Sequence, residues 1–172
     1  MNLPCGAALF LGLTAAAAAQ PVKRADLQPA GERKPAPEFA LKDSAGKTAA
    51  LKKYRGKVVL LDFWATWCHG CKEEIPWFAE FAKTYRKRGL EVVGVSMDEG
   101  GWAVLKPFLA ENHVPYRMLL GDEETAKRYG AADNLPDTFL IDRKGRVAAA
   151  YVAGLVDKDD VEKNLKAMLA QK

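Results

Sequence analysis

Two cysteines separated by two residues, Cys68 and Cys71, follow an apolar stretch that is predicted to be a strand, at the start of a predicted helix. A sulfur at a helix N-terminus meets unpaired backbone N–H groups and the positive end of the helix dipole. Both favour the thiolate, the form of cysteine that attacks a disulfide. The pair therefore predicts disulfide exchange, in which Cys68 is the exposed attacking sulfur and Cys71, one turn into the helix, releases what Cys68 captures.

The two residues between the cysteines are His69 and Gly70. An imidazole beside Cys68 could stabilise its thiolate and so make the disulfide more oxidising. It could equally face solvent with little effect, and the sequence leaves both interpretations open. Glycine at the second position loosens the turn.

Two carboxyl groups lie at spacings that could serve this pair. Asp62 interrupts the apolar strand six residues before Cys68. Burial there would raise the pKa of Asp62, which could then take the proton of Cys71, whereas a solvated aspartate would do neither. Glu74 lies three residues after Cys71, close enough on a helix to tune cysteine acidity. Alternatively, Glu73 and Glu74 simply complement the positive helix end.

The elements around the pair alternate between β and α. Apart from Asp62, residues 58–63 are a continuous apolar run, typical of a strand covered on both faces. A helix is predicted from about Cys68 to Arg88, ending at Gly89 and containing Pro76. A short hairpin over about residues 39–51 precedes this strand. The later predicted elements are a strand over 90–96, a helix over 101–111, a strand over 116–120, a helix over 123–129, strands over 137–142 and 146–153, and a final helix capped by Asp157.

The chain divides into three predicted parts. Residues 1–19 contain no charged side chain and end in an alanine tract, which indicates a signal peptide cleaved near Ala19. The apolar run before the alanines is shorter than the roughly 20 residues of a spanning helix, but a retained segment would anchor the protein. Residues 20–37, rich in Pro, Ala and charge, are predicted to be a disordered or extended linker, and residues 38–172 a single domain.

The cysteine, histidine and charged-residue content limits the kinds of function that the chain can have. Removal of the signal peptide would leave only the Cys68 and Cys71 pair, in a compartment where disulfides persist. No metal site is predicted, because a closed zinc site needs four ligands and the chain adds only His69 and His113. Residues 20–57 carry ten Lys or Arg against four acids. This bias could attract acidic lipid or an acidic partner, or simply be solvated, and no motif indicates nucleic-acid binding.

Several motifs together resemble the thioredoxin superfamily. These are Trp67-Cys68 in a C-x-x-C pair after a strand, Pro76 five residues beyond the second cysteine, and Leu135-Pro136 before a late strand. The opening residues 37–43, with Gly46 and Gly56-Lys57, and the extra helix and strand between Leu90 and Leu120 are similar to the TlpA/ResA/DsbE branch of exported thioredoxin-like proteins. The resemblance covers about residues 37–170.

The resemblance implies an α/β, thioredoxin-like fold: a central mixed sheet flanked by helices, with an N-terminal β-hairpin and an inserted helix and strand. It implies a thiol-disulfide oxidoreductase whose only redox group is its own Cys68–Cys71 disulfide, with no other cofactor. Pro136 would be a cis-proline that presents backbone to the substrate, beside Trp67, His69 and Gly70 at the substrate surface. Asp62 and Glu74 would match the buried aspartate of thioredoxin and the glutamate of ResA-like proteins.

The branch also implies partners and a location. It favours a periplasmic or otherwise extracytoplasmic monomer that reduces protein disulfides, with apocytochrome c as a candidate client and an upstream membrane or periplasmic electron donor. Two other functions stay open. One is a peroxiredoxin-like peroxide reductase, although the Pro- and Thr-bearing loop of peroxiredoxins is absent around Cys68. The other is a thioredoxin-fold module that binds clients without exchange.

Overall fold

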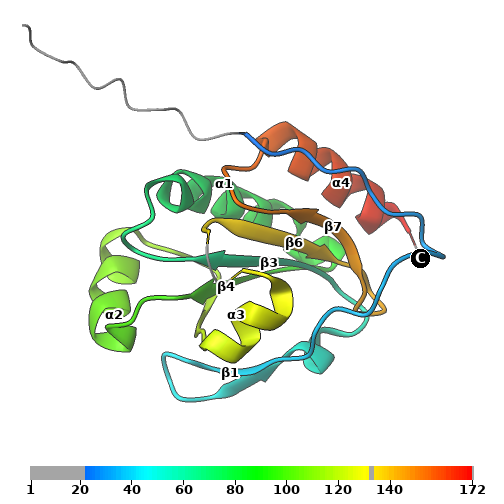
Figure 1. The fold of residues 1–172 in the computed structure, drawn as a ribbon. Coiled ribbons are helices and arrows are strands. Elements are labelled where there is room, and N and C mark those ends of the chain that lie inside the picture. The colour runs from blue at the N-terminus through cyan, green and yellow to red at the C-terminus, as the bar shows by residue number, and fades with distance from the viewer. Residues whose placement is uncertain (1–21, 132–133, 172) are drawn as a thin grey trace, which may run out of the picture.

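Strand β3 (Val58–Trp64) is an interior strand of the sheet and is buried along its whole length. It pairs in parallel with β4 (Leu90–Ser96) and antiparallel with β6 (Asp137–Ile141). Helices cover both faces of this sheet, as the mainly apolar sequence of β3 predicts (Figure 1). The computed structural model describes residues 22–131 and 134–171, so the predicted signal peptide lies outside the described residues.

The described residues form one mixed sheet of seven strands in the order β2-β1-β5-β4-β3-β6-β7. This confirms the predicted fold class, including the N-terminal hairpin and the inserted helix and strand. The other strands are β1 (Ala40–Asp43), β2 (Thr48–Ala50), β5 (Arg117–Leu120) and β7 (Val147–Tyr151). The helices are α1 (His69–Tyr85), α2 (Gly101–Glu111), α3 (Glu123–Tyr129) and α4 (Lys158–Ala170), with short 3-10 segments η1 (Leu51–Tyr54) and η2 (Arg86–Arg88).

Successive side chains of β3 point to opposite faces of the sheet. On one face, Leu60 belongs to a core cluster with Phe78 of α1 and Leu165 of α4. On the other, Phe63 packs against Tyr129 of α3 with 5.1 Å between ring centroids. Full burial of each such side chain contributes about 1.5–3 kcal/mol to folding. These two layers hold β3, and therefore the chain segment that follows it, in a fixed position.

The boundaries of the first helix follow from its end residues. Cys68 is the N-cap of α1, and Gly89 ends η2 in the left-handed conformation at φ 95°. Together α1 and η2 cover the predicted helix from Cys68 to Arg88. Pro76 lies inside α1. None of the helices in the described part of the chain is long and apolar enough to cross a membrane.

The segment before the hairpin is extended, which is one of its two predicted states, but it is not a free linker. Residues 22–37 are extended but pack on the domain, running along α4 in Figure 1. Gln28 N–H donates to the Ala148 carbonyl at 2.8 Å, and the buried Arg33 guanidinium lies 3.3 Å from the Asp142 carboxylate. The predicted boundary at residue 38 is therefore too late. The sequence did not reveal this docking because the partner of Arg33 lies 109 residues away.

Candidate functional site

The cysteine pair lies between the end of β3 and the first turn of α1, at the carboxyl end of the parallel strands β3 and β4. Cys68 and Cys71 form a disulfide with 5.3 Å between their Cα atoms. The Cys68 sulfur accepts a hydrogen bond from the Cys71 backbone N–H at 3.2 Å. That N–H is one of the unpaired donors at the start of the helix, so its position favours negative charge on Cys68.

The two sulfur-bearing residues differ in accessibility, but less than predicted. Cys68 is 5% exposed and Cys71 is 0% exposed. The order agrees with the prediction, whereas the description of Cys68 as exposed is wrong. The physical reason is packing: both cysteines belong to a small apolar cluster with Trp64 and Ile75, and Leu135 packs against it.

The residues around the disulfide divide between surface and interior. The Leu135–Pro136 peptide bond is cis, as predicted. Trp67 is 68% exposed directly beside Cys68, while Gly70 is buried. The His69 side chain is 85% exposed and its Nε2 lies 3.5 Å from a Glu73 carboxylate oxygen. Of the two interpretations of His69, the structure places its imidazole in solvent.

Asp62 and Glu74 are both buried, at 1% and 0% exposure. Asp62 accepts a hydrogen bond from the Thr138 hydroxyl at 3.3 Å, and Glu74 accepts one from the Val156 backbone N–H at 2.8 Å. Burial raises the pKa of Asp62 to about 8, although the hydrogen bond from Thr138 acts to lower it. Burial and the nearby Asp62 carboxylate raise the pKa of Glu74 to about 9. Both groups can therefore hold a proton near neutral pH.

Two further polar groups near these carboxyls were missed from the sequence. Asp137, directly after Pro136, is 1% exposed, and burial raises its pKa to about 6. One of its oxygens accepts a 2.6 Å hydrogen bond from Ala153 N–H, and the other is unpaired in the described structure. The Tyr116 hydroxyl is also buried and unpaired there, and burial, then Asp62 and Glu74, raises its pKa. An acid at the first position of a buried strand was the available signal for Asp137.

Asp98 fixes the loop that leads into the cysteine pair. Its carboxylate accepts hydrogen bonds from the Thr66 N–H at 3.1 Å, from the Thr66 hydroxyl at 2.6 Å and from the Ser96 hydroxyl at 2.8 Å. Because β3 and β4 are parallel, residues 66 and 98 follow neighbouring strand ends. The sequence offered no signal for this contact beyond that topology.

A hollow of about 520 Å³ adjoins the pair. Trp67 and Leu135 line it together with Met97, and its acidic lining residues are Asp98, Glu99, Asp122 and Glu123. The hollow is large enough for side chains of a bound chain segment. In the part of the chain that the structure describes, no group of three or more His, Cys, Asp or Glu side chains is placed to hold a metal ion.

The chemistry that this arrangement supports is thiol-disulfide exchange. The site combines a disulfide at a helix N-terminus, a more accessible first sulfur, and buried carboxyl groups able to exchange protons.

Comparison with known proteins agrees with the geometry. The model of the AhpC/TSA family matches residues 33–150. The thiol-disulfide oxidoreductase ResA of Geobacillus kaustophilus is 34% identical over 133 residues, covering 77% of this chain and 75% of that protein. ResA of Bacillus subtilis is 36% identical over 123 residues, covering 71% and 68%.

Solved structures give the same result. A crystal structure described as a thiol:disulfide interchange protein DsbE from Chlorobium tepidum is 31% identical, with a TM-score of 0.73, covering 87% of this chain and 100% of that chain. A secreted thiol-disulfide isomerase from Corynebacterium glutamicum, 21% identical with a TM-score of 0.78, shares the fold. These matches confirm the resemblance predicted from the motifs. The chain therefore belongs to the AhpC/TSA family of thioredoxin-like proteins and is a ResA-like thiol-disulfide oxidoreductase.

Proposed function

We propose that the protein reduces disulfides of other proteins outside the cytoplasm, acting as a monomer with its Cys68–Cys71 pair as its only redox group. The observation that carries this proposal is the disulfide at the start of α1, with Cys68 more accessible than Cys71 and buried carboxyls nearby. The names of the ResA relatives and the charge-free, alanine-rich residues 1–19 support the activity and the export, respectively.

The reaction proceeds in two balanced steps. The Cys68 thiolate attacks a client disulfide, forming a bond between Cys68 and one client sulfur while the other client sulfur leaves and takes a proton. Cys71 then attacks the Cys68 sulfur, forming the Cys68–Cys71 disulfide and releasing the client as a dithiol. The client gains two electrons, and an upstream dithiol donor must restore the pair.

Asp62 and Glu74 handle the proton in the second step. Cys71 must lose its proton before it can attack, and it is buried away from solvent. A buried carboxyl whose pKa lies near that of a thiol can accept this proton, and both groups are shifted toward that range. The acidic hollow beside Trp67 receives the client segment. Pro136, which follows the lining residue Leu135, presents its backbone to that segment.

A trapping experiment tests the proposal. A Cys71→Ala variant should accumulate mixed disulfides on Cys68, because the resolving sulfur is absent. Mass spectrometry of the captured proteins would identify the clients, among which apocytochrome c is the candidate. A Cys68→Ala variant is the control and should capture none. Equal capture by both variants would contradict the proposed division of roles.

The direction of exchange needs a separate measurement. Equilibration with glutathione gives the potential of the pair, and a reductant should lie well below the roughly −120 mV of strongly oxidising proteins. A value near −120 mV would overturn the reductant proposal. Peroxide consumption at rates matching dithiol exchange would favour a peroxidase, and full cellular function of Cys68→Ala would favour a binding module.

A further inference from the structure

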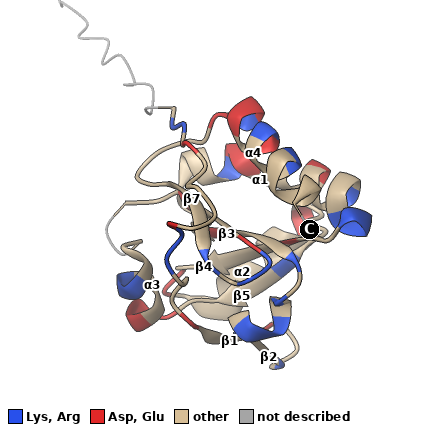
Figure 2. Ribbon diagram, turned by 90° about the vertical axis from the view of Figure 1, so that its right-hand side faces the viewer, with Lys and Arg blue, Asp and Glu red and all other residues tan. Residues whose placement is uncertain are grey.

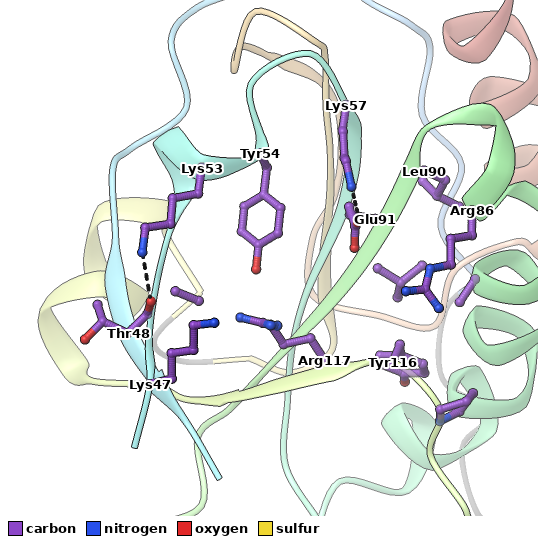
Figure 3. Close-up of a pocket in the computed structure, with 14 residues that line it drawn as sticks. Lys47, Thr48, Lys53, Tyr54, Lys57, Arg86, Leu90, Glu91, Tyr116 and Arg117 are labelled. Carbon is purple, nitrogen blue, oxygen red and sulfur yellow. Dashed lines mark hydrogen bonds and ion pairs between the residues drawn. The ribbon is translucent and has the colours of Figure 1, made fainter. Parts of the chain in front are cut away.

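Figure 3 shows a second hollow, of about 460 Å³. It forms where β4 extends beyond β5: the pairing of these strands begins with Val93 opposite Arg117, so residues 90–92 have no partner on that side within the described sheet. Strand β2 and segment η1 line the other wall. Lys57, which precedes β3, also lines it, so the length of β3, about 20 Å, separates it from the disulfide end.

The lining of this hollow is strongly basic. Its charged residues are Lys47, Lys53, Lys57, Arg86 and Arg117, with Glu91 as the one acid. Lys57 forms an ion pair with Glu91, and Arg117 lies 3.7 Å from the Asp43 carboxylate. Figure 2 shows Lys and Arg segments in blue beside β1 and β2. Most of this positive charge comes from the basic stretch over residues 20–57.

Three of the cations lack a compensating acid. Within the described residues, no carboxylate lies within ion-pair distance of Lys47, Lys53 or Arg86. Lys53 reaches only the Thr48 carbonyl, at 3.5 Å. Figure 3 shows the Lys47 ammonium and the Arg117 guanidinium pointing toward one another. Like charges that face each other across a hollow repel, and an anion between them removes that repulsion.

An unpaired hydroxyl points into the same space. The Tyr54 hydroxyl oxygen is buried and has no hydrogen-bond partner of normal geometry in the described structure. Burial raises the pKa of Tyr54, although the Arg117 guanidinium is near enough to act to lower it. Figure 3 shows it directed toward the region between Lys47 and Arg117. A buried polar atom without a partner destabilises the folded protein, and a ligand oxygen that accepts a hydrogen bond from this hydroxyl would remove that penalty.

We propose that this hollow is a binding site for a phosphate-bearing anion. Arginine forks match phosphate oxygens in pairs, lysines supply point charges, and the Tyr54 hydroxyl donates a further hydrogen bond. Apolar lining atoms from Ala82, Leu90 and Pro115 would contact the organic part of the ligand. The volume is in the range of small-molecule sites. The phosphate belongs either to a soluble compound or to a lipid headgroup, and the site is independent of the cysteine chemistry.

Calorimetric titration with sodium pyrophosphate, at a constant ionic strength of about 0.15 M, tests the site. The variant Lys47→Gln/Arg86→Gln removes two unpaired cations from the hollow. Lys87→Gln/Lys163→Gln removes the same charge from exposed positions that do not line it. The wild type and the control should bind saturably with a Kd below about 1 mM, and the hollow variant about tenfold more weakly. Tyr54→Phe should weaken binding severalfold without changing charge.

A vesicle arm identifies the source of the phosphate. Sedimentation with phosphatidylcholine vesicles, with and without phosphatidylglycerol, should depend on Lys47 and Arg86 if the ligand is a headgroup. Pyrophosphate binding without such sedimentation indicates a soluble ligand. The proposal is overturned if neither probe binds saturably, or if the hollow variant and its control lose binding equally. Insulin reduction should be unchanged in both variants. A failure of the anion-binding proposal would therefore leave the proposed oxidoreductase function standing.

Discussion

At the level of single residues, the two cysteines differ in their surroundings because Cys68 caps the helix and Cys71 lies inside its first turn. The Cys68 sulfur accepts a hydrogen bond from the Cys71 backbone N–H, whereas Cys71 is fully buried within the first turn of α1. In the reduced protein the same N–H would stabilise a Cys68 thiolate. Cys71 is closed off from solvent, and in the proposed mechanism it passes its proton to Asp62 or Glu74.

Asp62 should make folding stability depend on pH. Its pKa in the folded protein is about 8, against about 3.9 in an unfolded chain. Between these values the folded state holds a proton that the unfolded state releases, so the free energy of unfolding falls as pH rises. Each such group contributes about 1.4 kcal/mol per pH unit. Asp62→Asn should therefore flatten the decline between about pH 5 and pH 8 in urea titrations of the oxidised protein.

The matched control for this prediction is Asp26→Asn, which changes an exposed aspartate. It should leave the pH dependence of the unfolding free energy parallel to that of the wild type. Parallel curves for Asp62→Asn as well would mean that the Asp62 carboxyl ionises alike in the folded and unfolded states.

Trp67 should contribute to client binding and little to stability, because its side chain is largely exposed beside Cys68. Aromatic side chains at the centre of an interface often contribute about 2 kcal/mol to binding. Trp67→Ala should raise the KM for a protein disulfide roughly tenfold while leaving the melting temperature nearly unchanged. Val22→Ala, at an exposed apolar residue of the N-terminal segment, is the control. Unchanged KM for Trp67→Ala would remove Trp67 from the client surface.

At the level of elements, the N-terminal segment and α4 form one edge of the domain. Arg33 binds the Asp142 carboxylate, which also forms an ion pair with Arg146 at 2.7 Å. Because Asp142 would keep Arg146, Arg33→Met should lower the free energy of unfolding by about 2 kcal/mol rather than abolish folding. Trypsin should also cleave residues 22–37 faster, because the segment loses its buried anchor.

Arg24→Met is the matched control for the docked segment. Arg24 also pairs with an aspartate, Asp157, but its side chain is 75% exposed. Exposed pairs contribute little, so this variant should unfold like the wild type. Equal effects of the two substitutions, or no effect of Arg33→Met, would show that the segment is not held by the buried pair.

Local signals predicted most elements, since their end residues act over a few positions. Asp157 caps α4 through hydrogen bonds to the backbone N–H groups of residues 159 and 160, and Gly130 ends α3 in the left-handed conformation. The docking of Arg33 could not be predicted in this way. It depends on a contact between distant parts of the chain, which no local pattern records.

At the level of the whole molecule, topology brings the site together. Parallel β3 and β4 end at the same edge, which places Asp98 beside Thr66, and antiparallel β6 places Thr138 beside Asp62. The motifs predicted Asp62 and Glu74 because those positions follow from spacing to the cysteines. Asp137 and Tyr116 reach the same interior only through strand packing, so spacing alone did not reveal them.

The central claim is that Cys68 captures the client and Cys71 releases it. The most direct test is alkylation of the reduced protein with limiting iodoacetamide at neutral pH, with fragment mass spectrometry to assign the modified cysteine. The structure predicts that Cys68 reacts first, faster than Cys71 by about tenfold or more. Equal or faster modification of Cys71 would contradict this assignment.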